Sequence, residues 1–218
     1  MRWVVFDFGE VIGLRTKALP TLAARIGAPA EEFAEVYWEH RDAYDRDSDD
    51  LGYWRRLGAP FGVEVEEALS AELTEIDCAG WLHAVPETVA LIAELAQAGV
   101  ALAVLSNAPS SFGRAVEQQP WAKYFRHLLF SGDLGVAKPD REIWAALLAR
   151  LDAAAADCLF VDDRQVNVDG ALAAGLRAAH WHSAGAVRPR LVEFGVLAED
   201  GRAPSTRSAQ ARPAVPFE

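Results

Sequence analysis

Short apolar runs separated by amphipathic stretches set the pattern of this chain. The runs predict strands at residues 3–6, 100–105 and 158–161, with shorter ones at 128–130 and 179–181. Such runs, rich in valine, leucine and aromatic residues, are typical of strands buried on both faces. From residue 86 onward, the apolar positions between strands have helical spacing. This alternation predicts an α/β fold with a Rossmann-like parallel sheet and helices on both faces.

A long helical stretch separates the first strand from the rest of the predicted sheet. Apolar positions have helical spacing at residues 18–26, 33–44, 51–57 and 65–76, and no strand pattern occurs between 14 and 85. We therefore expect residues 1–13 and 86–200 to form the α/β core and residues 14–85 an inserted all-helical unit. Residues 201–218 lose the periodicity and gain proline, serine and arginine, which predicts a disordered tail.

Composition narrows the function classes. The net charge of −11 argues against nucleic acid as a partner, because phosphate backbones attract basic proteins. No apolar run approaches the ~18 residues of a membrane span, and Asp7 interrupts the first run, so neither a membrane partner nor a secretory signal is expected. Two cysteines, Cys78 and Cys158, make no disulfide framework, which fits a cytoplasmic location. An acidic chain can still bind a small anion in a local positive pocket.

Polar residues directly after the predicted strands are the candidate chemistry. They are Asp7 after the first strand, Ser106 and Asn107 after the second, Asp162 and Asp163 after the third, with Lys138 in a loop. Ligands bind at the carboxyl ends of parallel strands, so these side chains should meet at one edge of the sheet. Each residue alone would be explained as a helix or turn cap. Their order along the chain instead predicts one shared site.

The chemistry of these groups is complementary. A carboxylate such as Asp7 can attack phosphorus and form an aspartyl-phosphate. Because an anion then attacks an anion, we expect Mg²⁺, held by a few carboxylates and the phosphate itself. Lys138 adds positive charge, and Ser106 with nearby main-chain N–H groups can bind phosphoryl oxygens. The expected substrate is therefore a small phosphorylated molecule.

Four local sequences resemble the motifs of the haloacid dehalogenase-like (HAD) superfamily. They are Asp-Phe-Gly at 7–9, Leu-Ser-Asn at 105–107, Lys-Pro at 138–139 and Val-Asp-Asp at 161–163. The helical stretch is similar to the cap domain that this family inserts after its first strand. The local sequences around the motifs resemble the bacterial α-D-glucose-1-phosphate phosphatase branch. Examples are Phe-Asp-Phe-Gly-Glu-Val-Ile and Phe-Val-Asp-Asp-Arg-Gln-Val-Asn. The resemblance covers about residues 1–195.

The resemblance implies a metal site and its ligands. Asp7 and Asp163 would bind Mg²⁺ through carboxylate oxygens, and Gly9 would contribute its main-chain carbonyl. Asp162 and Asn167 would support these ligands through hydrogen bonds.

The resemblance also implies catalytic roles. Asp7 would be the nucleophile, and Lys138 would orient it and balance its charge. Ser106 would bind the transferring phosphoryl group, with Asn107 beside it.

One position departs from the pattern of most family phosphatases. These enzymes carry a second aspartate two residues after the nucleophile as general acid/base, and here that residue is Gly9. Glycine cannot transfer a proton. Glu10 is the nearest replacement, and it could equally point away and pair elsewhere.

Three functions compete at this stage. The first is a Mg²⁺-dependent phosphatase. The second is a 2-haloacid dehalogenase, which also uses a strand-end aspartate and a lysine but needs no metal. Without a cation, Asp162 and Asp163 would repel Asp7. The presence of this aspartate pair therefore favours the phosphatase. The third is a weakly active or inactive binding protein on the same fold. Gly9 favours this alternative, and retention of Asp7, Lys138 and Asp163 opposes it.

The helical unit is expected to select the substrate. Its aromatic and charged residues that could face the site are Trp38, Arg41, Tyr44, Asp45, Tyr53 and Trp54. The acidic run at residues 45–50 is typical of a solvated helix end. We expect a monomer or homodimer that binds neither nucleic acid nor membrane.

Overall fold

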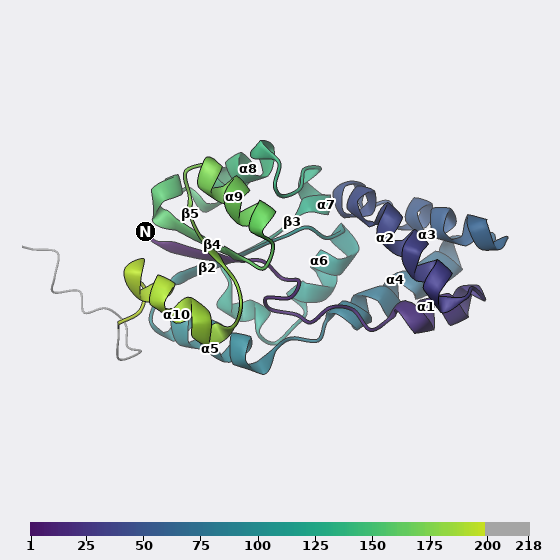
Figure 1. The fold of residues 1–218 in the computed structure, drawn as a ribbon, viewed down its shortest axis with the longest axis horizontal. Coiled ribbons are helices and arrows are strands. Elements are labelled where there is room, and N and C mark those ends of the chain that lie inside the picture. The colour runs from purple at the N-terminus through teal and green to yellow at the C-terminus, as the bar shows by residue number, and fades with distance from the viewer. Residues whose placement is uncertain (199–218) are drawn as a thin grey trace, which may run out of the picture.

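A parallel five-stranded sheet forms the centre of the molecule. The computed structural model describes residues 1–198, and the strands follow the order β3-β2-β1-β4-β5 (Figure 1). The strands are β1 (Trp3–Phe6), β2 (Ala101–Ser106), β3 (His127–Phe130), β4 (Cys158–Asp162) and β5 (Arg177–His180). Every residue of β1, β2 and β4 is buried. The predicted parallel α/β fold is confirmed.

Alternating side chains of β1 divide between two hydrophobic cores. Val4 and Phe6 face one core, and Trp3 and Val5 face the other, as the two-residue period of a strand requires. Figure 1 shows α5 and α10 against one face of the sheet and α8 and α9 against the opposite face. These helices are α5 (Pro86–Gln97), α8 (Arg141–Leu151), α9 (Gln165–Ala173) and α10 (Ala184–Glu193). Burial on both faces explains why the strands are continuous apolar runs.

Four helices between β1 and α5 form what we call the helical block. They are α1 (Leu19–Ile26), α2 (Ala30–Asp47), α3 (Asp50–Gly58) and α4 (Glu67–Trp81), with a 3₁₀ turn at Ala59–Phe61. A separate core inside the block contains Leu22, Phe33, Tyr53, Trp54 and Leu73. Figure 1 shows the block beyond the carboxyl ends of the strands.

The two chain segments that join the block to the sheet run side by side. Gly13 and Ala84 form an antiparallel bridge, and Leu14 N–H donates to the carbonyl of His83 at 2.9 Å. A Cβ on Gly13 would lie 2.4 Å from Cε1 of Phe8, so only glycine lets the linker approach the core this closely.

Several boundaries differ from the sequence-based prediction. The second strand spans Ala101–Ser106 rather than 100–105, and the last strand spans Arg177–His180 rather than 179–181. Shorter elements complete the fold: α6 (Ser110–Glu117), α7 (Ser131–Leu134) and 3₁₀ turns at Ala122–Tyr124 and Ala155–Asp157. The tail expected at 201–218 lies outside the described residues. Within residues 1–198, no helix combines the length and hydrophobicity needed to cross a bilayer.

Candidate active site

Three neighbouring strands place polar side chains side by side at their carboxyl ends. The register pairs Phe6 of β1 with Val104 of β2 and with Val161 of β4. Asp7, one residue beyond, donates its N–H to the carbonyl of Val161 at 2.9 Å. Parallel pairing therefore brings Asp7 level with Asp162. The strand-end residues singled out in the sequence do lie at one edge of the sheet.

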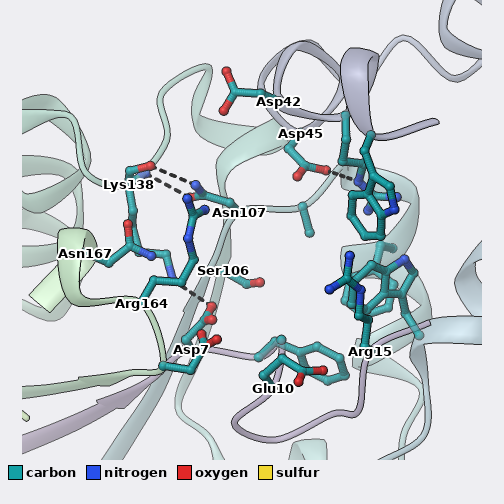
Figure 2. A pocket seen from close by; sticks show the side chains of 18 residues that line it. Asp7, Glu10, Arg15, Asp42, Asp45, Ser106, Asn107, Lys138, Arg164 and Asn167 are labelled. Carbon is teal, nitrogen blue, oxygen red and sulfur yellow. Dashed lines mark hydrogen bonds and ion pairs between the residues drawn. The ribbon is translucent and has the colours of Figure 1, made fainter. Parts of the chain in front are cut away.

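Lys138, from the loop between α7 and α8, bridges two of these carboxylates. Its Nζ donates to Oδ1 of Asp7 at 2.6 Å (Figure 2). It also donates to Oδ2 of Asp162 at 2.7 Å. Burial alone would lower the pKa of Lys138, but the two carboxylates outweigh burial and raise it. Lys138 therefore remains an ammonium, although its side chain is almost fully buried.

Asn107 fixes the main chain of Lys138. Its Nδ2 donates to the carbonyl of Lys138 at 2.8 Å, and its Oδ1 accepts from the N–H of Lys138 at 2.8 Å (Figure 2). Each end of the Asn107 amide is thus bonded to Lys138, and Asn107 also lines the cavity described below. The hydroxyl of Ser106 has no hydrogen-bond partner among residues 1–198, and Ser106 lines the cavity described below. Ser106 is therefore the member of this pair that can bind a ligand.

The carboxylate of Asp162 is held from several directions. Beyond Lys138, its Oδ1 accepts from Arg164 N–H at 2.8 Å, and Asn167 Nδ2 lies 3.1 and 3.0 Å from its two oxygens. Both oxygens of this fully buried carboxylate are therefore engaged. Oδ1 of Asn167 is buried without any partner in the described part of the chain, and Asn167 lines the cavity. It remains an acceptor for a bound group.

The carboxylates fit a divalent cation. Oxygens of Asp7, Asp162 and Asp163 lie within 4.8 Å of one another. Burial raises the pKa of Asp7 against the opposing charge of Lys138, and burial together with Asp162 raises the pKa of Asp163. A single ammonium leaves this cluster with excess negative charge, and oxygen ligands are those that Mg²⁺ prefers. Because Asp162 is already engaged, Asp7 and Asp163 are the residues that would hold the ion.

A cavity of about 470 Å³ lies between this edge and the helical block. Its size is that of a small-ligand site. The strand-edge side contains Asp7, Ser106, Lys138, Asp163 and Asn167. The opposite wall includes Arg15 before α1, Trp38, Arg41, Asp42 and Asp45 of α2, and Trp81 of α4. Figure 2 shows Asp45 and Arg15 across the cavity from Asp7.

Asp45 is a largely buried carboxylate, with 13% of its side chain exposed, which corrects the expectation of a solvated run at 45–50. Arg41 Nε donates to Oδ1 of Asp45 at 2.7 Å, and Arg41 Nη1 donates to Oδ2 of Asp77 at 2.9 Å. The ion pair with Arg41 thus holds the carboxylate of Asp45 against the helical block. Burial still raises the pKa of Asp45 to about 7, because Arg41 is shared with a second carboxylate.

The aromatic residues proposed to face the site divide into two groups. Trp38 lines the cavity, whereas Tyr44, Tyr53 and Trp54 are buried in the core of the helical block. Helical spacing alone could not separate these two groups, since both faces of α2 carry aromatic residues.

Gly9 and Glu10 both line the cavity. A Cβ on Gly9 would meet no heavy atom within 4 Å, so packing does not require glycine there. Glu10 is exposed and has φ 57°, a left-handed conformation that is strained for residues with a side chain. Glu10 thus brings an exposed carboxylate to the cavity one residue after Gly9.

Several residues of the cavity wall were not singled out in the sequence, among them Arg15, Asp42, Trp81 and Arg164. Arg164 directly follows Asp162 and Asp163, so its place in the sequence next to two predicted site residues could have identified it. Arg15 and Trp81 lie in or next to the linkers of the helical block, and no pattern distinguishes them from ordinary surface residues.

The fold and the site define an α/β enzyme with a lysine-bridged carboxylate site at the edge of a parallel sheet. The profile of the haloacid dehalogenase-like hydrolases matches residues 1–175. The chain belongs to this hydrolase family.

Curated relatives include two phosphatases. The chain is 29% identical over 144 residues to the sesquiterpene phosphatase astK of Aspergillus oryzae, covering 66% of this chain and 71% of the relative. It is 35% identical over 106 residues to a phosphoserine phosphatase of Thermus thermophilus, covering 48% of this chain and 42% of the relative.

Solved structures share the fold at low sequence identity. An L-2-haloacid dehalogenase from Xanthobacter autotrophicus, with chloropropionic acid covalently bound, has a TM-score of 0.67 at 21% identity over 88% of this chain and 83% of that chain. A HAD family enzyme from Bacteroides thetaiotaomicron, in complex with magnesium and inorganic phosphate, has a TM-score of 0.66 at 15% identity over 84% and 94%.

Proposed function

We propose that this protein is a Mg²⁺-dependent phosphatase of a small phosphorylated metabolite, acting through an aspartyl-phosphate on Asp7. The observation that carries the proposal is the excess of carboxylate at the site. Lys138 bridges Asp7 and Asp162, and Asp163 adds a third carboxylate within 4.8 Å. Such a set calls for a cation. The phosphatases among the relatives, and the magnesium and phosphate in a structural neighbour, support the same function.

The residues define two chemical steps. An oxygen of Asp7 attacks phosphorus, the ester P–O bond breaks, and the leaving oxygen takes a proton from Glu10 or from water. Water then attacks phosphorus, the bond to Asp7 breaks, and inorganic phosphate leaves while the water proton passes to solvent. Lys138 orients Asp7 and offsets its charge, and the Ser106 hydroxyl donates to a phosphoryl oxygen. Mg²⁺ would be held by Asp7, Asp163 and the carbonyl of Gly9, and it would supply charge neutralisation.

The helical block, within residues 14–85, is proposed to act as a cap on the core formed by 1–13 and 86–200. Trp38, Asp45 and Trp81 of the block line the same cavity as Asp7, which supports this role. A cap excludes water and contacts the organic part of the substrate. The finer resemblance to the α-D-glucose-1-phosphate phosphatase branch stays a prediction.

A second candidate is a 2-haloacid dehalogenase, which the fold similarity to such an enzyme and the glycine at position 9 favour. Its chemistry has no use for a cation. Asp163, with its carboxylate near Asp7, therefore favours the phosphatase.

A substrate panel separates the two functions. Phosphorylated metabolites, p-nitrophenyl phosphate and 2-chloropropionate are assayed with Mg²⁺ and after chelation with EDTA. The phosphatase predicts phosphate release that requires Mg²⁺ and no chloride release. Chloride release that survives EDTA, without phosphate release, would establish the dehalogenase instead.

A further inference from the structure

A guanidinium without a carboxylate partner faces the cavity from its far wall. Arg15 forms no ion pair and no side-chain hydrogen bond with any other residue in 1–198, although Glu10 lines the same cavity. Its guanidinium carbon lies 4.7 Å from the centre of the Trp38 ring. Figure 2 shows Arg15 across the cavity from Asp7. Stacking occupies one face of the guanidinium and leaves its N–H edge for a ligand.

The main chain on both sides of Arg15 is fixed. Leu14 N–H donates to the carbonyl of His83 at 2.9 Å, and the hydroxyl of buried Thr16 accepts from Ala18 N–H at 3.1 Å. Trp38 in turn packs edge-on against Trp81, with ring centres 6.1 Å apart. The exposed side chain of Arg15 therefore extends from a fixed main chain and lies against a packed ring, which lowers the entropy cost of binding a ligand.

The other cations at the cavity have different tasks. Lys138 is bonded to Asp7 and Asp162, and Arg41 to Asp45 and Asp77.

Arg164 also has no ion pair within the described residues, but it directly follows Asp163 and lies on the same side of the cavity as Asp7 (Figure 2). That side receives the transferring phosphoryl group. Arg15 stands on the opposite wall, where the organic part of the substrate must extend.

We propose, on the basis of the phosphatase function above, that Arg15 stacked on Trp38 binds a second anionic group on the leaving-group part of the substrate. A guanidinium matches carboxylate and phosphate alike, because its planar fork donates two parallel hydrogen bonds. The substrate class is therefore a phosphate ester of a hydroxy acid, or a bisphosphate. A neutral sugar phosphate, which the sequence resemblance implies, has no second anion for Arg15. Arg15 is a specificity residue for the charge of the leaving group.

The test compares matched esters that differ in that charge. O-phosphorylated hydroxy acids of two and three carbons are each paired with their neutral carboxamide, and an ethanediol bisphosphate is paired with the monophosphate. The readout is kcat/KM for each pair with Mg²⁺ present, in the wild type, Arg15→Gln and Arg15→Lys. The matched control is Lys17→Gln, because Lys17 is an exposed cation of the same linker that does not line the cavity.

We expect the wild type to prefer the charged member of at least one pair by roughly 10- to 100-fold, the span of a charge-assisted hydrogen bond. Arg15→Gln should remove that preference, Arg15→Lys should retain part of it, and Lys17→Gln should retain all of it. The pair that shows the preference identifies the anion as carboxylate or phosphate.

Two results would overturn the assignment while leaving the phosphatase intact. One is equal kcat/KM for charged and neutral esters in the wild type. The other is a preference that survives Arg15→Gln, and Arg164→Gln then shows whether Arg164 is its source. Failure of the wild type to hydrolyse any ester, including p-nitrophenyl phosphate, would instead refute the phosphatase function and this inference with it.

Discussion

Asn107 forms two hydrogen bonds with the main chain of Lys138, one through each end of its amide, with Nδ2–O and Oδ1–N distances of 2.8 Å. The side chain of Lys138 extends from this fixed point to Asp7 and Asp162. By holding the main chain of Lys138, Asn107 thus sets the position of the ammonium beside the nucleophile.

Asn107→Ala is expected to lower kcat by roughly 10- to 100-fold, as loss of an orienting hydrogen bond does in comparable sites. KM should change less, because Ser106 and the cavity wall remain. Gln119→Ala is the matched control, since it removes an amide-to-carbonyl hydrogen bond away from the cavity. Equal kinetics for the Asn107 and Gln119 variants would show that Lys138 needs no such support.

Gly9→Asp should restore proton supply to the leaving group. The structure leaves space for it, as no heavy atom lies within 4 Å of the new Cβ. General acid catalysis contributes ~10²- to 10⁴-fold, so the gain should appear for alkyl phosphates and be small for p-nitrophenyl phosphate. Gly9→Asn, equal in shape but without an acidic proton, is the control. If both variants change the two substrates in parallel, proton supply does not limit the wild type.

Glu10→Gln tests the residue that stands next to that position. If Glu10 is the acid, the substitution lowers kcat for alkyl phosphates selectively and leaves aryl phosphates nearly unchanged, because aryl oxides leave without a proton. An equal effect on both ester classes would show that Glu10 is not the proton donor.

Asp45 makes the stability of the folded chain depend on pH. Burial raises its pKa to about 7 from the ordinary value of 3.8, so the folded state binds a proton that the unfolded state has released. Its stabilising contribution is therefore present below pH ~4 and is lost as pH rises through about 7. Asp45→Asn keeps an oxygen for Arg41 but cannot titrate. The Tm of this variant should rise relative to wild type between pH 5 and 8; parallel Tm profiles would contradict the proposed burial of a titrating carboxylate.

Magnesium should stabilise the protein as well as activate it. Bound cation relieves repulsion between Asp7 and Asp163, so added Mg²⁺ should raise Tm, and EDTA should abolish phosphate release. Asp163→Asn should need a higher Mg²⁺ concentration for the same Tm shift. Asp157→Asn, which alters a carboxylate away from the cavity, should behave as wild type. If added Mg²⁺ leaves the Tm of all three proteins unchanged, the proposal that this site binds the metal is contradicted.

The edge of the sheet could be predicted from sequence because strand geometry is local. Continuous apolar runs identify strands buried on both faces, and parallel pairing then brings their ends together. Asp7 and Asp162 become level for this reason, before any side-chain contact is known. Lys138, which lies in a loop, could be included in the predicted site because a cluster of carboxylates needs a positive charge nearby.

The far wall of the cavity could not be predicted in the same way. Asp45 is buried because Arg41 and Asp77, 36 positions apart in the chain, meet inside the helical block. Arg15 faces the cavity because a main-chain bridge between Gly13 and Ala84 orients the linker. Both depend on long-range packing, which leaves no periodic signal near the residue itself.

The most direct measurement is the mass of the protein quenched in acid during turnover of p-nitrophenyl phosphate. If Asp7 is the nucleophile, part of the protein carries one added phosphoryl group, and peptide mapping assigns it to the segment that contains Asp7. Asp7→Asn should show neither the adduct nor turnover. Steady phosphate release by a protein that never carries the adduct, or that keeps its rate after Asp7→Asn, would contradict the mechanism.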